Sequence, residues 1–177
     1  ESLNRRRVVS VLFMLFVGEI MADLTKEQVV KIMREERLVM MASLSESGKI
    51  QTHPMTPQEI TDDADAWFFI ALNSDQARQI KANREVNLAF AETGSWLSVS
   101  GTIEFVEDRA QAEKLWNKGM EAYFEGVNDP NLGLIRFNSE SAQFWGTPGG
   151  KVMALAEIVK NRLTGADHDG TSDTVEL

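Results

Sequence analysis

Apolar and polar residues alternate along much of this chain, a pattern typical of β-strands with one buried face. The clearest case is the segment 96–106, where Leu97, Val99, Gly101, Ile103 and Phe105 fall on one face. The segment 66–72 is apolar almost throughout and contains Trp67-Phe68-Phe69-Ile70, which indicates a buried strand. We expect strands at 38–44, 49–55, 66–72, 86–91, 96–106, 132–137 and 142–145.

Turn and breaker residues refine these strands. Ser45-Glu46-Ser47-Gly48 separates the first two expected strands and predicts a hairpin. Pro54 and Pro57 mean that the second strand ends there or lies at a sheet edge. Gly101, inside a long strand, indicates a bulge or a close approach of two backbones.

Four helices are expected between or after these strands. Thr25 and Gln28 form a capping box that opens the first helix. Ser74 is a suitable N-cap for a short helix that continues to about Ala82, and Asp108 caps the next helix. A fourth helix is expected at 152–163. Helices are too few for a doubly wound parallel sheet, so the pattern favours a mainly β fold, an antiparallel barrel of six to seven strands with peripheral helices.

Composition limits the chemistry more than it identifies it. The chain has 177 residues, which suits one folded domain, and no cysteine, which excludes disulfides and thiolate sites. Its two histidines, His53 and His168, lie far apart, and no His-x-x-His spacing for zinc is present. The net charge of -9 argues against a general nucleic-acid surface or an anionic-membrane surface.

The two ends of the chain differ from the middle. Arg5-Arg6-Arg7 and the apolar run 8–17 resemble the start of a signal peptide, but the run is too short to span a bilayer. Met21-Ala22-Asp23 looks like a natural start, so we expect 1–20 to be an extension outside the fold, with export as the alternative. We expect the folded domain at 21–164, a flexible acidic tail at 165–177, and a cytoplasmic location.

The sequence contains no nucleophile elbow, Walker loop or dinucleotide-binding glycine motif. One stretch has the features of a binding site for flavin mononucleotide (FMN). Such a site has apolar strand residues beside the flavin ring and a helix start with cations at the phosphate. Here an aromatic strand leads into a helix that carries Ser74, Arg78 and Lys81, and His53 precedes them. The alternative is that these aromatic residues are core and the two cations lie on a solvated helix face.

Ten short motifs, in this order and spacing, resemble the bacterial general stress protein branch of the pyridoxamine 5'-phosphate oxidase-like family. The resemblance covers about residues 24 to 165. Its motifs are 38–44 (LVMMASL), 54–56 (PMT), 67–69 (WFF), 80–83 (IKAN), 86–90 (VNLAF), 98–101 (SVSG), 115–117 (LWN), 123–126 (YFEG), 128–132 (NDPNL) and 142–145 (AQFW).

This resemblance implies a split β-barrel homodimer with FMN at each of two subunit-interface sites. It assigns ten cofactor-binding residues: His53, Met55 and Thr56 along one strand, Phe69 and Ile70 beside the ring and ribityl chain, Ser74, Asp75 and Lys81 around the phosphate, and Phe124 and Trp145 over the ring, from the partner chain.

The chain departs from the family in three places. His53 stands where the family usually has Arg, and imidazole is mostly neutral at pH 7, so we expect weaker binding that strengthens as the pH falls. Asp75-Gln76 stands where the oxidases carry basic residues. The Arg-x-His segment with which the oxidases hold their substrate is missing, so we do not expect pyridoxamine-phosphate oxidase activity.

The leading hypothesis is therefore an FMN-binding redox protein of general stress type, with NADH or NADPH as donor of a flavin reductase reaction. Neither nucleic acid nor a membrane is expected as a partner. The alternatives are a non-catalytic split barrel that carries FMN, a deazaflavin or haem, and a dimeric interaction module without cofactor. No residue is identified as a general acid or base.

Overall fold

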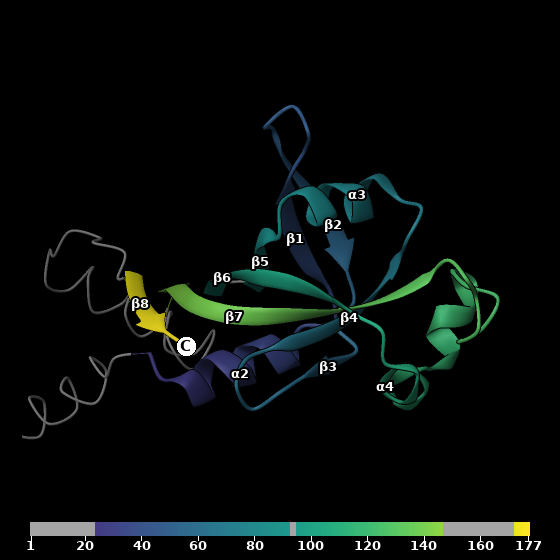
Figure 1. Ribbon diagram of the computed structural model, residues 1–177. Helices are drawn as coiled ribbons and strands as arrows, with labels where there is room; N and C mark the ends of the chain where they lie inside the picture. Colours follow the sequence, from purple (N-terminus) through teal and green to yellow (C-terminus); the bar gives the residue numbers. More distant parts are fainter. Residues whose placement is uncertain (1–23, 93–94, 147–171) are drawn as a thin grey trace, which may run out of the picture.

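The computed structural model describes residues 24–92, 95–146 and 172–177 (Figure 1). In chain order its elements are α2 (Lys26–Glu35), β1 (Val39–Leu44), β2 (Ile50–Met55), β3 (Glu59–Ile60), β4 (Ala66–Ala71), α3 (Asp75–Ala82), β5 (Glu85–Glu92), β6 (Ser95–Val106), α4 (Arg109–Leu115), the 3-10 helix η1 (Lys118–Ala122), β7 (Leu132–Gly146) and β8 (Ser172–Glu176). The helix expected at 152–163 lies outside the described residues.

Eight strands form one antiparallel sheet in the order β2-β1-β5-β6-β7-β4-β3, with β8 paired to β7. Helix α3 lies beside β1 and β2, whereas α2 lies next to β3 on the other side of β6 and β7 (Figure 1). Residues from both helices and from five strands share one buried core, so the sheet is a partial barrel closed by these helices. This confirms the expected mainly β split-barrel class.

Local capping explains where the helices begin. The hydroxyl oxygen of Thr25 accepts the backbone N–H of Gln28, and the Gln28 side chain accepts the N–H of Thr25, which completes the capping box. Ser74 caps α3, and Asp108 caps α4. These side chains satisfy N–H groups that a helix start leaves unpaired. All three sequence-based helix starts in the described part of the chain are confirmed.

The aromatic strand β4 is apolar throughout because both of its faces are buried. Phe68 and Ile70 lie in the main core, whereas Phe69 packs into a second cluster with Leu115 and Phe124. A strand that is covered on both sides loses the alternation of polar and apolar residues. The second cluster attaches α4 and η1 to the outside of the barrel.

We expected two strands at 132–137 and 142–145, and the structure has one, β7, because β6 pairs with both segments; on the other edge the two halves have different partners. Residues 132–137 pair with β4, and residues 141–145 pair with β8. We expected a flexible acidic tail at 165–177; within it, Ser172–Glu176 form the strand β8, and Val175 and Leu177 pack against the main core. Residues 165–171 lie outside the described ranges.

The bulge predicted at Gly101 is confirmed. The register between β6 and β7 shifts between Ser100 and Gly101. A β-carbon at position 101 would collide with the carbonyl oxygen of Asn138 and lie 2.8 Å from the ring of Phe137. Only glycine lets the two backbones approach this closely.

In the described residues, no helix is long and apolar enough to cross a membrane.

We expect Gly101→Ala to lower the free energy of unfolding by about 1–3 kcal/mol, since the added methyl group overpacks this contact. Ser100→Ala, at the exposed neighbouring position, should change it by about 0.5 kcal/mol or less. Urea denaturation of the three proteins measures both values. Equal stability of Gly101→Ala and the parent protein would contradict the close approach.

Candidate functional site

The strand β2 lies at one end of the sheet order and carries three of the residues expected to line a flavin. His53 and Met55 are half-buried, and Thr56, directly after the strand, is exposed. Among the described residues no strand pairs with the far edge of β2. Backbone groups along such an edge are free to bind a ligand. The structure therefore keeps these three residues together beside an open sheet edge.

The imidazole of His53 is the unusual polar group of this strand. Its Nδ1 atom is buried and has no hydrogen-bond partner in the described residues. His53 is opposite Met41 in the β1–β2 register, so both side chains lie on the same face of the sheet. Because an unpaired buried polar atom is costly, His53 is a candidate for contact with a bound group.

Three polar side chains form a hydrogen-bonded chain between α3 and the β1–β2 hairpin, which we call the amide cluster: Ser43, Gln51 and Gln79. The Ser43 hydroxyl donates to Gln79 Oε1 at 3.2 Å, and Gln79 Nε2 donates to Gln51 Oε1 at 2.6 Å. Next to it, the buried Gln76 directs its Nε2 to the sulfur of Met41 at 3.6 Å. From the sequence alone, Gln76 is evident only as a departure from basic residues, and the amide cluster is not predicted. Its signal in the sequence is the spacing of Gln76 and Gln79, three residues apart on one helix.

The three residues expected around the phosphate are not brought together. The Ser74 hydroxyl is already used, because it donates to Ala71 O at 2.7 Å and accepts from Ala77 N at 3.1 Å. Asp75 forms an ion pair with Arg78. Lys81 is in the last turn of α3, about 10 Å along the helix axis from Ser74 at 1.5 Å per residue.

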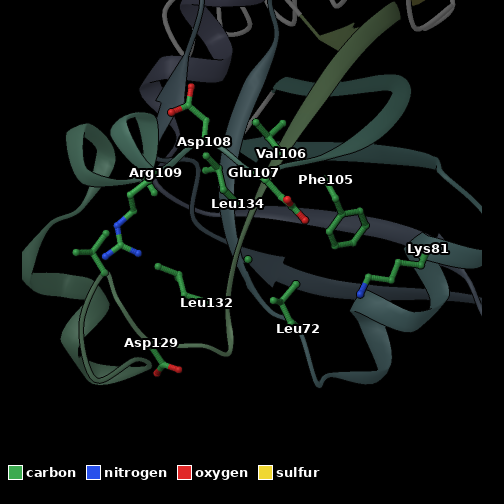
Figure 2. A pocket seen from close by; sticks show the side chains of 13 residues that line it. Leu72, Lys81, Phe105, Val106, Glu107, Asp108, Arg109, Asp129, Leu132 and Leu134 are labelled. Atoms are coloured by element: carbon green, nitrogen blue, oxygen red, sulfur yellow. The ribbon is translucent and has the colours of Figure 1, made fainter.

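Lys81 lies instead at a groove of about 460 Å³ between α3, the end of β6 and the start of α4 (Figure 2). Its ammonium nitrogen is 5.2 Å from the centre of the Phe105 ring, a cation–π distance. Figure 2 shows Arg109 on the opposite side of this groove, with Leu72 and Leu132 between the two cations. None of the other nine expected site residues lines the groove.

The aromatic residues expected beside the ring have different positions. Phe69 is 7% exposed and packs on Trp116 at a ring separation of 6.0 Å. Phe124, at 8%, belongs to the same cluster, and Ile70, at 4%, belongs to the main core. Within one chain these three residues are core residues and leave no free ring face.

Trp145, by contrast, is exposed on the outer face of the sheet. It is opposite Trp96 in the β6–β7 register, and the two side chains are 39% and 52% exposed. The same face continues across four strands as mostly small side chains. We call this surface the outer face: Met40, Ala42, Asn87, Ala89, Trp96, Ser98, Ser100, Gln143 and Trp145.

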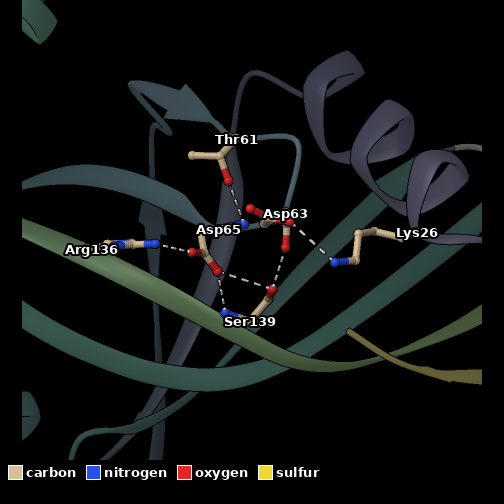
Figure 3. A network of polar contacts seen from close by, with 6 residues as sticks. All are labelled: Lys26, Thr61, Asp63, Asp65, Arg136 and Ser139. Atoms are coloured by element: carbon tan, nitrogen blue, oxygen red, sulfur yellow. Dashed lines mark hydrogen bonds and ion pairs between the residues drawn. The ribbon is translucent and has the colours of Figure 1, made fainter.

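One further polar network serves the fold (Figure 3). The carboxylate of Asp65 accepts from Arg136 at 2.5 Å and from the backbone N–H of Ser139 at 2.9 Å. The Ser139 hydroxyl also donates to the carbonyl of Asp63, whose side chain pairs with Lys26 at 3.4 Å. These contacts join the turn before β4 to the middle of β7.

The described residues contain no cluster of three or more His, Asp or Glu that could hold a metal.

A family model described as "Pyridoxamine 5'-phosphate oxidase like" matches residues 25–169 of the chain. The protein bli-3 of Neurospora crassa is 30% identical over 112 residues, which are 57% of this chain and 54% of that protein. This chain thus spans about half the length of that relative.

Two solved structures have a similar fold. A candidate general stress protein 26 from Jannaschia sp. CCS1 superposes with a TM-score of 0.69 at 27% identity, over 85% of this chain and 96% of that one. The general stress FMN/FAD binding protein of Xanthomonas citri gives a TM-score of 0.59 at 30% identity, over 71% of this chain and 91% of that one.

We expect Asp65→Asn to lower the free energy of unfolding by about 1.5–3 kcal/mol, because hydrogen bonds to a charged, nearly buried acceptor are weakened. Asp63→Asn is the matched control, since that side chain is 82% exposed. Its ion pair is worth about 0–1 kcal/mol. Denaturation curves that show equal losses for both variants would contradict the role of Asp65.

We expect Gln79→Ala to cost about 1–3 kcal/mol of stability, since it leaves the buried Ser43 hydroxyl and Gln51 without their shared partner. Arg78→Ala removes the neighbouring, exposed side chain of the same helix and should change stability by about 0.5 kcal/mol or less. Thermal and urea unfolding measure the difference. A stable Gln79→Ala protein would show that the amide cluster does not hold α3 in place.

Proposed function

We propose a flavin-binding redox function for this chain, which belongs to the pyridoxamine 5'-phosphate oxidase-like family. The observation that carries the proposal is the edge of β2, which no described strand covers, with the buried Nδ1 of His53, which has no partner among the described residues, beside it. A flavin ring needs an apolar surface and backbone groups at its polar edge, and an unpaired strand edge offers both. The similar Xanthomonas citri protein, which binds FMN or FAD, supports the same reading.

We propose FMN as the cofactor, held by His53, Met55 and Thr56. Flavin supplies hydride or electron transfer when it is bound, and the chain supplies orientation and exclusion of water. Met55 is partly buried against the main core and offers an apolar contact. His53 offers a ring nitrogen that is hydrogen-bonded to no described group. A nicotinamide donor, NADH or NADPH, belongs to the same proposal.

The outer face supports a homodimer. Met40, Trp96 and Trp145 are exposed on one surface at 41%, 52% and 39%, and the side chains between them are small. Exposed tryptophan and methionine side chains among small and polar residues are typical of an interface between subunits. A second copy of the chain would cover these residues and would bring Trp145 to the partner's flavin.

We expect the protein to be a dimer that binds one FMN per subunit, and Ala89→Arg to lower both dimerisation and FMN affinity by at least about tenfold. The reason is that a bulky, unpaired charge buried at the centre of an interface is strongly unfavourable. Ser47→Arg adds the same charge in the exposed β1–β2 turn and is the control. Analytical ultracentrifugation and flavin fluorescence titration measure the two effects.

A monomeric parent protein, or a dimer that survives Ala89→Arg unchanged, would exclude the outer face as the interface.

The absorption spectrum separates the remaining hypotheses. Bound flavin gives a yellow protein, a deazaflavin shifts the band, and haem gives a Soret band. A colourless protein that gains no thermal stability from FMN would favour the module without cofactor, since ligand at 100 times its Kd stabilises by about 2.7 kcal/mol.

A further inference from the structure

The side of α3 that faces the barrel is neutral. Its buried polar residues are Gln76 and Gln79, each less than a tenth exposed. Gln79 is held between Ser43 and Gln51 in the amide cluster, and Gln76 contacts Met41. No Lys or Arg takes part in these hydrogen bonds.

His53 adjoins the same place from β2. It is opposite Met41 in the strand register, and Met41 receives the hydrogen bond of Gln76. An imidazole and a primary amide, neither of which is a permanent cation, therefore flank one methionine.

The cations of α3 are directed elsewhere. Arg78 is paired with Asp75, and Lys81 lies over the Phe105 ring at the separate groove. Asp75 also adds a negative charge in the first turn of the helix. Tight phosphate recognition in proteins relies on charge-assisted hydrogen bonds from Arg or Lys. The described residues of this site therefore present no permanent cation to the phosphate of FMN.

We propose that this site recognises the neutral part of a flavin and does not select for the terminal phosphate, so that riboflavin binds about as tightly as FMN. This inference rests on the proposed flavin-binding function. Gln76 and Gln79 are less than a tenth exposed, and their amides are already hydrogen-bonded to Met41, Ser43 and Gln51, so this side of α3 supplies no cation to a bound flavin. The chain's net charge of -9 gives no long-range attraction for a phosphate dianion.

The test is a fluorescence titration of the flavin-free, full-length protein with riboflavin and with FMN at pH 7.5 and at two salt concentrations. We expect the two dissociation constants to agree within about threefold, and their ratio to be insensitive to salt because no charged contact is involved. An FMN affinity at least tenfold above that of riboflavin would overturn the inference. Absence of binding of either flavin would instead refute the proposed function.

Gln76→Lys supplies the missing cation. We expect it to tighten FMN binding at least tenfold and to leave riboflavin binding unchanged, since only FMN carries the phosphate. Gln111→Lys makes the same change on α4, away from this site, and should not alter the ratio. His53→Arg is the second variant, because His53 is only half-buried and tolerates the larger side chain if Gln76→Lys is unstable.

Two results would count against this placement of the phosphate end. The first is a folded, flavin-binding Gln76→Lys or His53→Arg protein whose FMN-to-riboflavin ratio equals that of the parent. The second is a selective loss of FMN affinity in Lys81→Ala, which would place the phosphate at the groove beside Phe105.

Discussion

The structure depends on how β7 changes partners in the middle of its length. Its first half pairs with β4 and its second half with β8, while β6 follows it on the other side through both halves. Two contacts lie where the partner changes: Gly101 lets β6 approach the backbone at Asn138, and Asp65 accepts the backbone N–H of Ser139, just past the end of the β4 pairing. A bulge with its exposed backbone group satisfied is a stable way to bend a sheet.

That bend sets the position of the candidate site. A continuous, curved β7 lets the sheet wrap around one core, which brings β1 and β2 to one end of the order and β4 close to the other. Helix α3 follows β4 in the chain but packs beside β1, where Gln79 forms the hydrogen bonds of the amide cluster. The same hydrogen bonds that seat the helix therefore decide which of its side chains face the open edge of β2.

Much of the fold follows from local sequence signals, and the part that does not follow is long-range. The caps at Thr25, Ser74 and Asp108 and the bulge at Gly101 depend on neighbouring residues, so the sequence predicts them. The pairing of 172–176 with β7 has no local signal, because a polar segment becomes a strand only where an edge is available. For the site, the grouping of His53, Met55 and Thr56 follows from one strand. The position of Lys81 over the Phe105 ring depends on where α3 lies relative to β6, which no local signal predicts.

The orientation of one short helix thus carries the chemistry of the candidate site. Residues 76, 79 and 80 of α3 face inward, whereas Arg78 and Lys81 face away, as a rotation of 100° per residue requires. A cation one position away from the inward stripe contributes solubility or a groove contact and cannot reach a ligand at β2. In an acidic chain, charge at this site therefore depends on which residues occupy a few inward positions, and in α3 these include glutamines in place of Lys or Arg. Ligand selectivity within one fold can change in this way while the strands and caps that build the barrel stay the same.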